Sequence, residues 1–197
     1  MTFATNKDWP EDLYNIFKIR LEQRDADAET SYLGPYNALL HHCFGDSFDY
    51  FVAPSHALSR APYENCDTNR SDFLAHVAVF NLERKPVLIV DIQAEYWSKH
   101  PYQRERADEL MRRRYNDLLD QCPIPDLYGL SLLGTSLRIY RGNVATREIE
   151  PAYQGHTDTN RILPRNFLEG LWDIDILSQD GFNRMKEIVS YIRANSA

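Results

Sequence analysis

The sequence has few of the residues that several common functions require. It holds three widely spaced Cys without a CxxC pattern, and eight Gly in 197 residues. A disulfide scaffold, a cysteine-based zinc site and a glycine-rich nucleotide loop are therefore not indicated. No apolar run approaches the ~20 residues that cross a bilayer, so we expect no membrane partner.

Positive charge is also scarce, because 22 Lys and Arg stand against 29 Asp and Glu, a net charge of −7. A protein that coats nucleic acid is normally basic overall, so this balance argues against that class but leaves room for a local basic site. Residues 1–11 are polar and include no apolar signal region. Together with the sparse, unpatterned Cys, this predicts an intracellular protein, cytoplasmic or nuclear.

Apolar and aromatic side chains are plentiful, with 43% hydrophobic residues including 12 Tyr and 9 Phe. This is enough for a sizeable core, and we expect a single domain over residues 1–197. Helical and strand-like apolar spacing predicts the order of elements. That order is a helix at about 10–24, a helix at 36–43, strands at 48–53, 73–80 and 86–92, a long helix at 103–122, strands at 127–133 and 137–140, a short strand at 148–152, and a closing helix at about 180–195.

A helix between the third and fourth predicted strands favours a mixed sheet, because parallel neighbours need a long crossover connection. The run Val87–Val90 is apolar at every position, which is typical of a central strand buried on both faces. We therefore predict an α/β fold, a three-layer sandwich around a central mixed sheet.

Acidic residues flank the hairpin of the second and third predicted strands. Asp72 opens the first of these strands and Asp91 closes the second, with Gln93 two residues later on the same face. A hairpin can bring the start of one strand beside the end of its partner. Two converging carboxylates would suit Mg²⁺ or Mn²⁺. The alternative for either residue is a solvated acid or a turn cap.

The same residues carry a resemblance to a known superfamily. An acidic residue at the start of the second strand, Asp-x-Gln at the end of the third, and the αβββαβ order resemble the PD-(D/E)XK nucleases. The segments 85–93, 106–108 and 128–135 look like those of fungal members of this superfamily. The resemblance covers about residues 29–141 and implies a restriction-endonuclease-like core, with helices added at both ends.

The resemblance also implies site roles. Asp72 and Asp91 match the metal-binding acids, and Glu29 matches an extra catalytic acid that some members place on their first helix. Gln93 stands where the family usually has Lys. Gln can orient a water molecule but cannot supply charge or exchange a proton. Some active members carry Gln at this position, so the sequence leaves both an active nuclease and a degenerate binding protein open.

The long predicted helix is locally basic. Residues 99–114 hold six basic and three acidic residues, a net charge of +3. In the superfamily this helix flanks the active site, and Arg can bind phosphate at two points. We expect Arg104, Arg106 and Arg113 to contact substrate, with a solvated helix face as the alternative. Tyr96 and Trp97, just before the helix, either stack on bases or plug the core, and we favour the plug.

These observations predict a metal-dependent nuclease-like domain that hydrolyses phosphodiester bonds of DNA or RNA, with Mg²⁺ or Mn²⁺ as cofactor and nucleic acid as partner. The alternative is a catalytically silent nuclease-fold protein that binds nucleic acid or protein. A homo-oligomer is compatible with the sequence.

Overall fold

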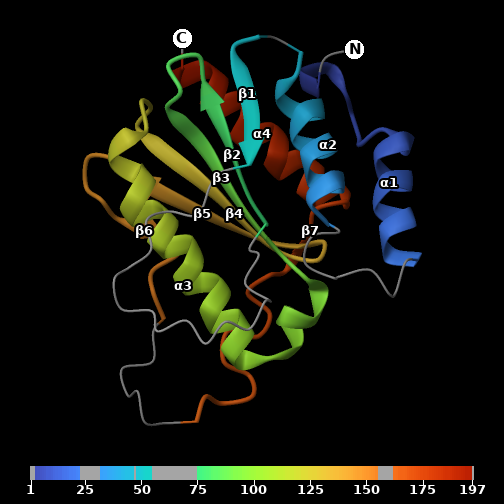
Figure 1. Cartoon of the computed structure of the whole chain (residues 1–197), viewed down its shortest axis with the longest axis vertical. Helices are drawn as coiled ribbons and strands as arrows, with labels where there is room; N and C mark the ends of the chain where they lie inside the picture. The colour runs from blue at the N-terminus through green and yellow to red at the C-terminus, as the bar shows by residue number, and fades with distance from the viewer. Residues whose placement is uncertain (1–2, 23–31, 47, 55–74, 155–161, 197) are drawn as a thin grey trace.

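The computed structural model describes residues 3–22, 32–46, 48–54, 75–154 and 162–196. Within these residues, seven strands form one sheet, in which β1 to β6 follow in chain order and β7 pairs with β5 (Figure 1). The strands are β1 (Tyr50–Pro54), β2 (Ala75–Asn81), β3 (Pro86–Gln93), β4 (Asp126–Leu133), β5 (Ser136–Asn143), β6 (Ile149–Glu150) and β7 (Ile174–Asp175). The helices are α1 (Glu11–Glu22), α2 (Leu33–Phe44), α3 (Pro101–Leu118) and α4 (Gln179–Asn195), with short 3-10 turns η1 (Phe3–Thr5), η3 (Glu95–Lys99) and η4 (Leu119–Gln121).

The sheet is mixed. β1, β2 and β3 pair antiparallel, β3 and β4 pair parallel, and β4 and β5 pair antiparallel. The parallel pair is the one that α3 connects, as the order of predicted elements required. Every residue of β3 is buried, which confirms a central strand. The predicted α/β class with a mixed sheet is therefore confirmed.

Helices cover both faces of the sheet, and two adjacent β4 residues mark the two faces because neighbouring strand residues point in opposite directions. Gly129 faces α3 so closely that a Cβ on it would lie 2.8 Å from the sulfur of Met111. Tyr128 faces the other way and packs its ring against Tyr191 of α4, with centroids 5.3 Å apart. This two-sided cover is compatible with the predicted three-layer sandwich.

The amino-terminal part of the chain joins the α4 layer. Arg193 of α4 donates to the carbonyl of Cys43 in α2 at 3.0 Å. Phe17 of α1 packs edge-on against Tyr36 of α2, with ring centroids 5.0 Å apart. α1 therefore packs on α2, and Figure 1 shows α2 lying between α1 and the sheet.

Most predicted elements have the predicted type, and their bounds shift by a few residues. The helix predicted at 36–43 begins at Leu33, and the strand predicted at 137–140 extends to Asn143. The helix predicted to reach residue 122 ends at Leu118 and continues as the 3-10 turn η4. β7 and η3 were not predicted, because a two-residue strand and a single tight turn have no periodicity to detect. The start of the strand predicted at 73–80 lies outside the described residues.

A buried carboxylate joins β4, β5 and α4. Asp126 accepts hydrogen bonds from Arg141 (2.6 Å), Asn143 (2.9 Å) and Tyr191 (2.6 Å). Burial opposes ionisation, but these donors outweigh it and hold the pKa of Asp126 below its ordinary value. Burial and the bond to Asp126 raise the pKa of Tyr191 to about 12.

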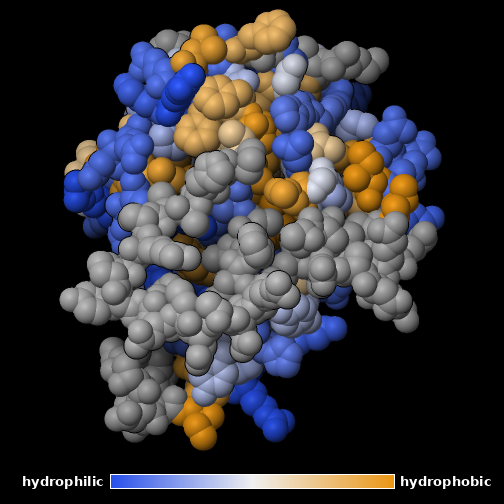
Figure 2. All heavy atoms as spheres, in the orientation of Figure 1, coloured by the Kyte–Doolittle hydropathy of each residue, from blue (hydrophilic) through white to orange (hydrophobic). Residues whose placement is uncertain are grey.

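In the view of Figure 2, the described surface is mixed, and apolar residues appear among hydrophilic ones, including near the β1 end of the sheet. Phe48 and Leu82 are among the exposed hydrophobic residues there. In the part of the chain that the structure describes, no helix has both the length and the apolar character for a membrane crossing.

We predict that Asp126→Asn lowers the free energy of unfolding by about 1–3 kcal/mol at pH 7, because three donors lose a charged acceptor. The folded-state pKa of Asp126 is depressed, so its stabilisation is present above about pH 4 and is lost as the pH falls through the folded-state value. The difference in the free energy of unfolding between wild type and variant should therefore become smaller at acid pH. Urea unfolding at several pH values measures it.

Asp120→Asn is the matched control. Asp120 also accepts from an arginine, Arg147, at 2.7 Å, but both side chains are well exposed. An exposed pair contributes about 0–1 kcal/mol. If both variants lowered the free energy of unfolding equally, a special role for the buried carboxylate of Asp126 would be contradicted.

Candidate functional site

One row of polar side chains crosses the face of the sheet that α3 covers. The register pairs His76 with Asp91, Asp91 with Ser131, and Ser131 with Arg138, so the row runs through β2, β3, β4 and β5. Cross-strand partners point to the same face, and all four residues are buried. Gln93 lies on this face as well, two residues beyond Asp91 on β3.

Asp91 is the carboxylate at the centre of this row, and its side chain is 2% exposed. His76 Nδ1 lies 2.7 Å from Oδ1 of Asp91, and Arg114 Nε from α3 lies 3.5 Å from the same oxygen. His76 Nδ1 also lies 3.1 Å from the carbonyl of Val90, so a proton on Nδ1 serves both acceptors. One oxygen of Asp91 thus lies at hydrogen-bond distance from His76 and at ion-pair distance from Arg114, whose Nε makes no hydrogen bond among the described residues.

Several buried polar atoms of the row have no hydrogen-bond partner among the described residues. They include Oδ2 of Asp91, Nε2 of Gln93 and Nε2 of His76. A buried polar group without a partner costs about 1–3 kcal/mol. Unpartnered atoms that gather on one face indicate a place for water or for a polar ligand.

A second acid, Asp108 of α3, anchors the far end of the row. It accepts hydrogen bonds from Arg112 Nε (2.8 Å) and the Tyr140 hydroxyl (2.7 Å), and Arg138 Nη1 lies 3.1 Å away. Burial raises the pKa of Tyr140, as does the nearby charge of Asp108. The guanidinium of Arg138 also lies over the Trp172 ring at 5.2 Å. Asp108 is therefore engaged in binding α3 to the sheet.

Among the described residues, no group of three His, Cys, Asp or Glu is placed to hold a metal ion. Asp91 offers one unpartnered carboxylate oxygen, and Mg²⁺ binds through one or two carboxylates while it keeps several waters. Asp91 therefore fits as one metal ligand, although the positive charge of Arg114 partly offsets its attraction for a cation. The predicted second ligand Asp72 and the predicted acid Glu29 lie outside the described residues and stay predictions.

The three arginines predicted to bind substrate lie in two different environments. Arg106 and Arg113 are exposed on the outer surface of α3. Arg104 is 3% exposed, and its guanidinium donates to three backbone carbonyls. These are the carbonyls of Ser98 (2.6 Å), Arg165 (2.7 Å) and Phe167 (2.8 Å). Arg104 therefore joins η3, α3 and the segment at 165–167, so the alternative of a solvated residue is wrong for Arg104, and its contact with substrate stays a prediction.

Arg114, which was not among the predicted site residues, is the α3 arginine beside Asp91. The helical pattern carried a signal for this. Ala107 and Met111 mark the buried side of α3. Arg104 lies three residues before Ala107 and Arg114 lies seven residues after it, so both arginines fall on the same side. His76 had no comparable signal, because only the strand register sets it opposite Asp91.

The structure separates the two aromatics that follow Gln93. Trp97 is buried against Leu133 and Trp172, which confirms its predicted place in a core. Tyr96 is 41% exposed, unlike the predicted plug. In the 3-10 turn η3, adjacent residues point in different directions, so one ring faces the core and the next faces solvent.

The chain was compared with protein-family models, curated proteins and solved structures, and none of the three comparisons found a match.

We predict that Arg104→Leu lowers the free energy of unfolding by about 2–4 kcal/mol, because three carbonyls lose a charged donor. Arg106→Leu, two residues later on the exposed side of the same helix, should cost less than about 1 kcal/mol. Urea unfolding followed by circular dichroism compares them. A stable Arg104→Leu protein would show that the three hydrogen bonds contribute little.

Proposed function

We propose that this chain is a PD-(D/E)XK-like domain that hydrolyses phosphodiester bonds of DNA or RNA with Mg²⁺ or Mn²⁺. The observation that carries the proposal is the state of Asp91. His76 and Arg114 engage one carboxylate oxygen, while Oδ2 has no partner among the described residues. A buried carboxylate oriented in this way, with one oxygen available, suits a metal ligand.

The topology supports the proposal. The resemblance implies a helix, an antiparallel meander of three strands, a crossover helix and a fourth strand parallel to the third. α2, β1 to β3, α3 and β4 follow this order with this pairing. Asp91 and Gln93 lie at the carboxyl end of β3, where ligands of open α/β sheets commonly bind.

Each residue has a proposed role. Asp91 would hold the metal together with Asp72, and a metal bound there would polarise the phosphodiester and supply hydroxide near neutral pH. Gln93 orients the attacking water through its amide but transfers no proton. Arg114 and His76 orient the carboxylate of Asp91, and the guanidinium of Arg114 adds positive charge beside the phosphate.

A second candidate is a nuclease-fold protein that binds nucleic acid without cleaving it. Two observations favour it. Gln93 replaces the charged Lys of the family pattern, and Asp91 is in close contact with two basic side chains, which weakens its attraction for a cation. This candidate predicts binding of oligonucleotides without hydrolysis, with or without metal.

We predict that the purified protein cleaves a labelled DNA or RNA oligonucleotide in Mn²⁺ or Mg²⁺ and that EDTA stops the reaction. Asp91→Asn should lower the cleavage rate at least about a hundredfold, since several kcal/mol of metal-derived stabilisation is lost. Gel analysis of the products measures the rate.

Asp173→Asn is the matched control, because Asp173 is an exposed acid on the neighbouring segment, and it should cleave at the wild-type rate. Gln93→Lys, which restores the usual family residue, should keep or raise the rate. Binding without cleavage by both wild type and Gln93→Lys would support the second candidate. Cleavage that survives EDTA or Asp91→Asn would overturn the first.

A further inference from the structure

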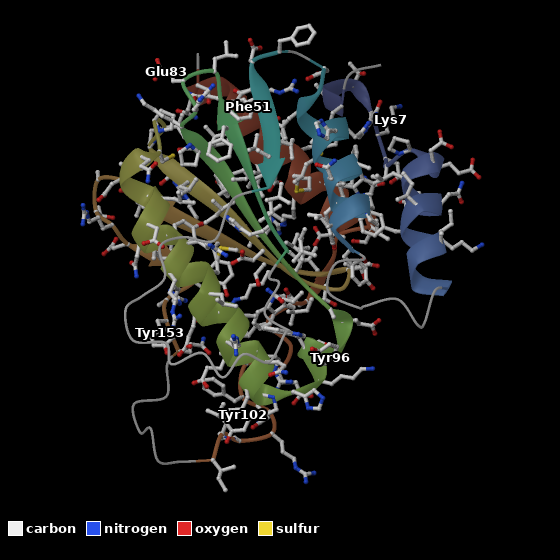
Figure 3. All side chains as sticks on the ribbon, in the orientation of Figure 1. Lys7, Phe51, Glu83, Tyr96, Tyr102 and Tyr153 are labelled. Carbon is white, nitrogen blue, oxygen red and sulfur yellow. The ribbon has the colours of Figure 1, made fainter. Side chains whose placement is uncertain are left out.

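Two exposed tyrosines lie just beyond the carboxyl end of β3. Tyr96 in η3 is 41% exposed, and Tyr102 in the first turn of α3 is 55% exposed. His100 lies between them in sequence, is exposed, and contacts the Tyr96 ring edge-on with centroids 6.5 Å apart. Figure 3 shows Tyr96 and Tyr102 at the same end of the molecule, far from Phe51 and Glu83.

The backbone beneath these rings is firmly held. Trp97 is buried beside Tyr96, and Arg104 binds the carbonyls of Ser98, Arg165 and Phe167. On the other side, the turn after β4 lies very close to η3. A Cβ added to Gly134 would lie only 2.9 Å from the Cβ of Glu95. The exposed rings therefore project from a rigid base, so little order has to be gained when a ligand binds.

The charge of this segment differs from that of the chain. Without the buried Arg104, residues 95–106 hold two cations (Lys99, Arg106) and two acids (Glu95, Glu105), so 2 − 2 = 0, whereas the chain carries −7. Lys99 and Arg106 are exposed. No acidic residue lies in the first turn of α3, and no side chain caps that turn, so its N–H groups add to the positive potential.

Exposed rings on a rigid base, with the exposed cations Lys99 and Arg106 beside them, suit single-stranded nucleic acid, in which unpaired bases stack on aromatic side chains and cations contact the phosphates. In a duplex the bases are stacked on each other and are not available to such rings. We infer that Tyr96 and Tyr102 form a stacking surface that selects single-stranded DNA or RNA beside the carboxyl end of β3, the strand that carries Asp91 and Gln93. The inference rests on the proposed function, and it assigns the strand form of the substrate.

The test is fluorescence anisotropy with a labelled single-stranded 20-nucleotide oligonucleotide and with its matched duplex, in EDTA so that no cleavage occurs. Wild type should bind the single strand at least about tenfold more tightly than the duplex. Each of Tyr96→Ala and Tyr102→Ala should weaken single-strand binding about tenfold, the effect of about one stacked base. Tyr96→Phe and Tyr102→Phe should bind like wild type, since stacking needs the ring and not the hydroxyl.

Phe48→Ala is the matched control. Phe48 is 99% exposed and precedes β1, whose start pairs with the end of β2 at the opposite end of the sheet. It should bind like wild type. Thermal melting shows whether each variant is folded, and if one Ala variant is not, the other Ala variant still tests the stacking surface. Duplex binding as tight as single-strand binding, or Ala variants that bind like wild type, would overturn the inference.

The two proposals fail separately. Tight, tyrosine-dependent binding of single strands without cleavage in Mn²⁺ supports the stacking surface and overturns the hydrolysis. Metal-dependent cleavage that is unchanged by both Ala variants supports the hydrolysis and overturns the stacking surface.

Discussion

The buried contact of Asp91 with His76 and Arg114 is the interaction on which the arrangement of the site depends. Removing a carboxylate from water is costly unless charged partners and hydrogen bonds compensate it. Here the partners come from a neighbouring strand and from α3, at 2.7 Å and 3.5 Å. The same contact therefore orients the carboxylate and links β2 and β3 to α3. It satisfies one oxygen of Asp91, and the other is left for water or a ligand.

The two buried acids outside the row's centre show what a purely structural carboxylate looks like in this fold. Asp126 accepts three hydrogen bonds, and Asp108 accepts from Arg112 and Tyr140 beside Arg138. Neither carboxylate has an unpartnered buried oxygen among the described residues, whereas Asp91 does. This contrast within one sheet is the physical reason to assign ligand binding to Asp91 in particular.

Much of the fold follows from the sequence, because periodicity and strand composition are local. The apolar run before Asp91 predicts a buried central strand, and the crossover helix predicts the parallel pair β3 and β4. Asp91 and Gln93 lie on one face by simple alternation. The sequence could not reveal the row from His76 to Arg138, because strand register depends on packing across the whole sheet. The three bonds of Arg104 were hidden for a similar reason, since two of its acceptors lie more than 60 residues away in sequence.

The most direct measurement of the central claim is a crystal structure of the protein soaked in Mn²⁺, with anomalous scattering used to locate the ion. The account predicts an ion bound at Oδ2 of Asp91, at about 2.0–2.2 Å, with His76 and Arg114 still on the other oxygen. A well-ordered site in which both oxygens of Asp91 are engaged by protein groups, with no ion in saturating Mn²⁺, would contradict it.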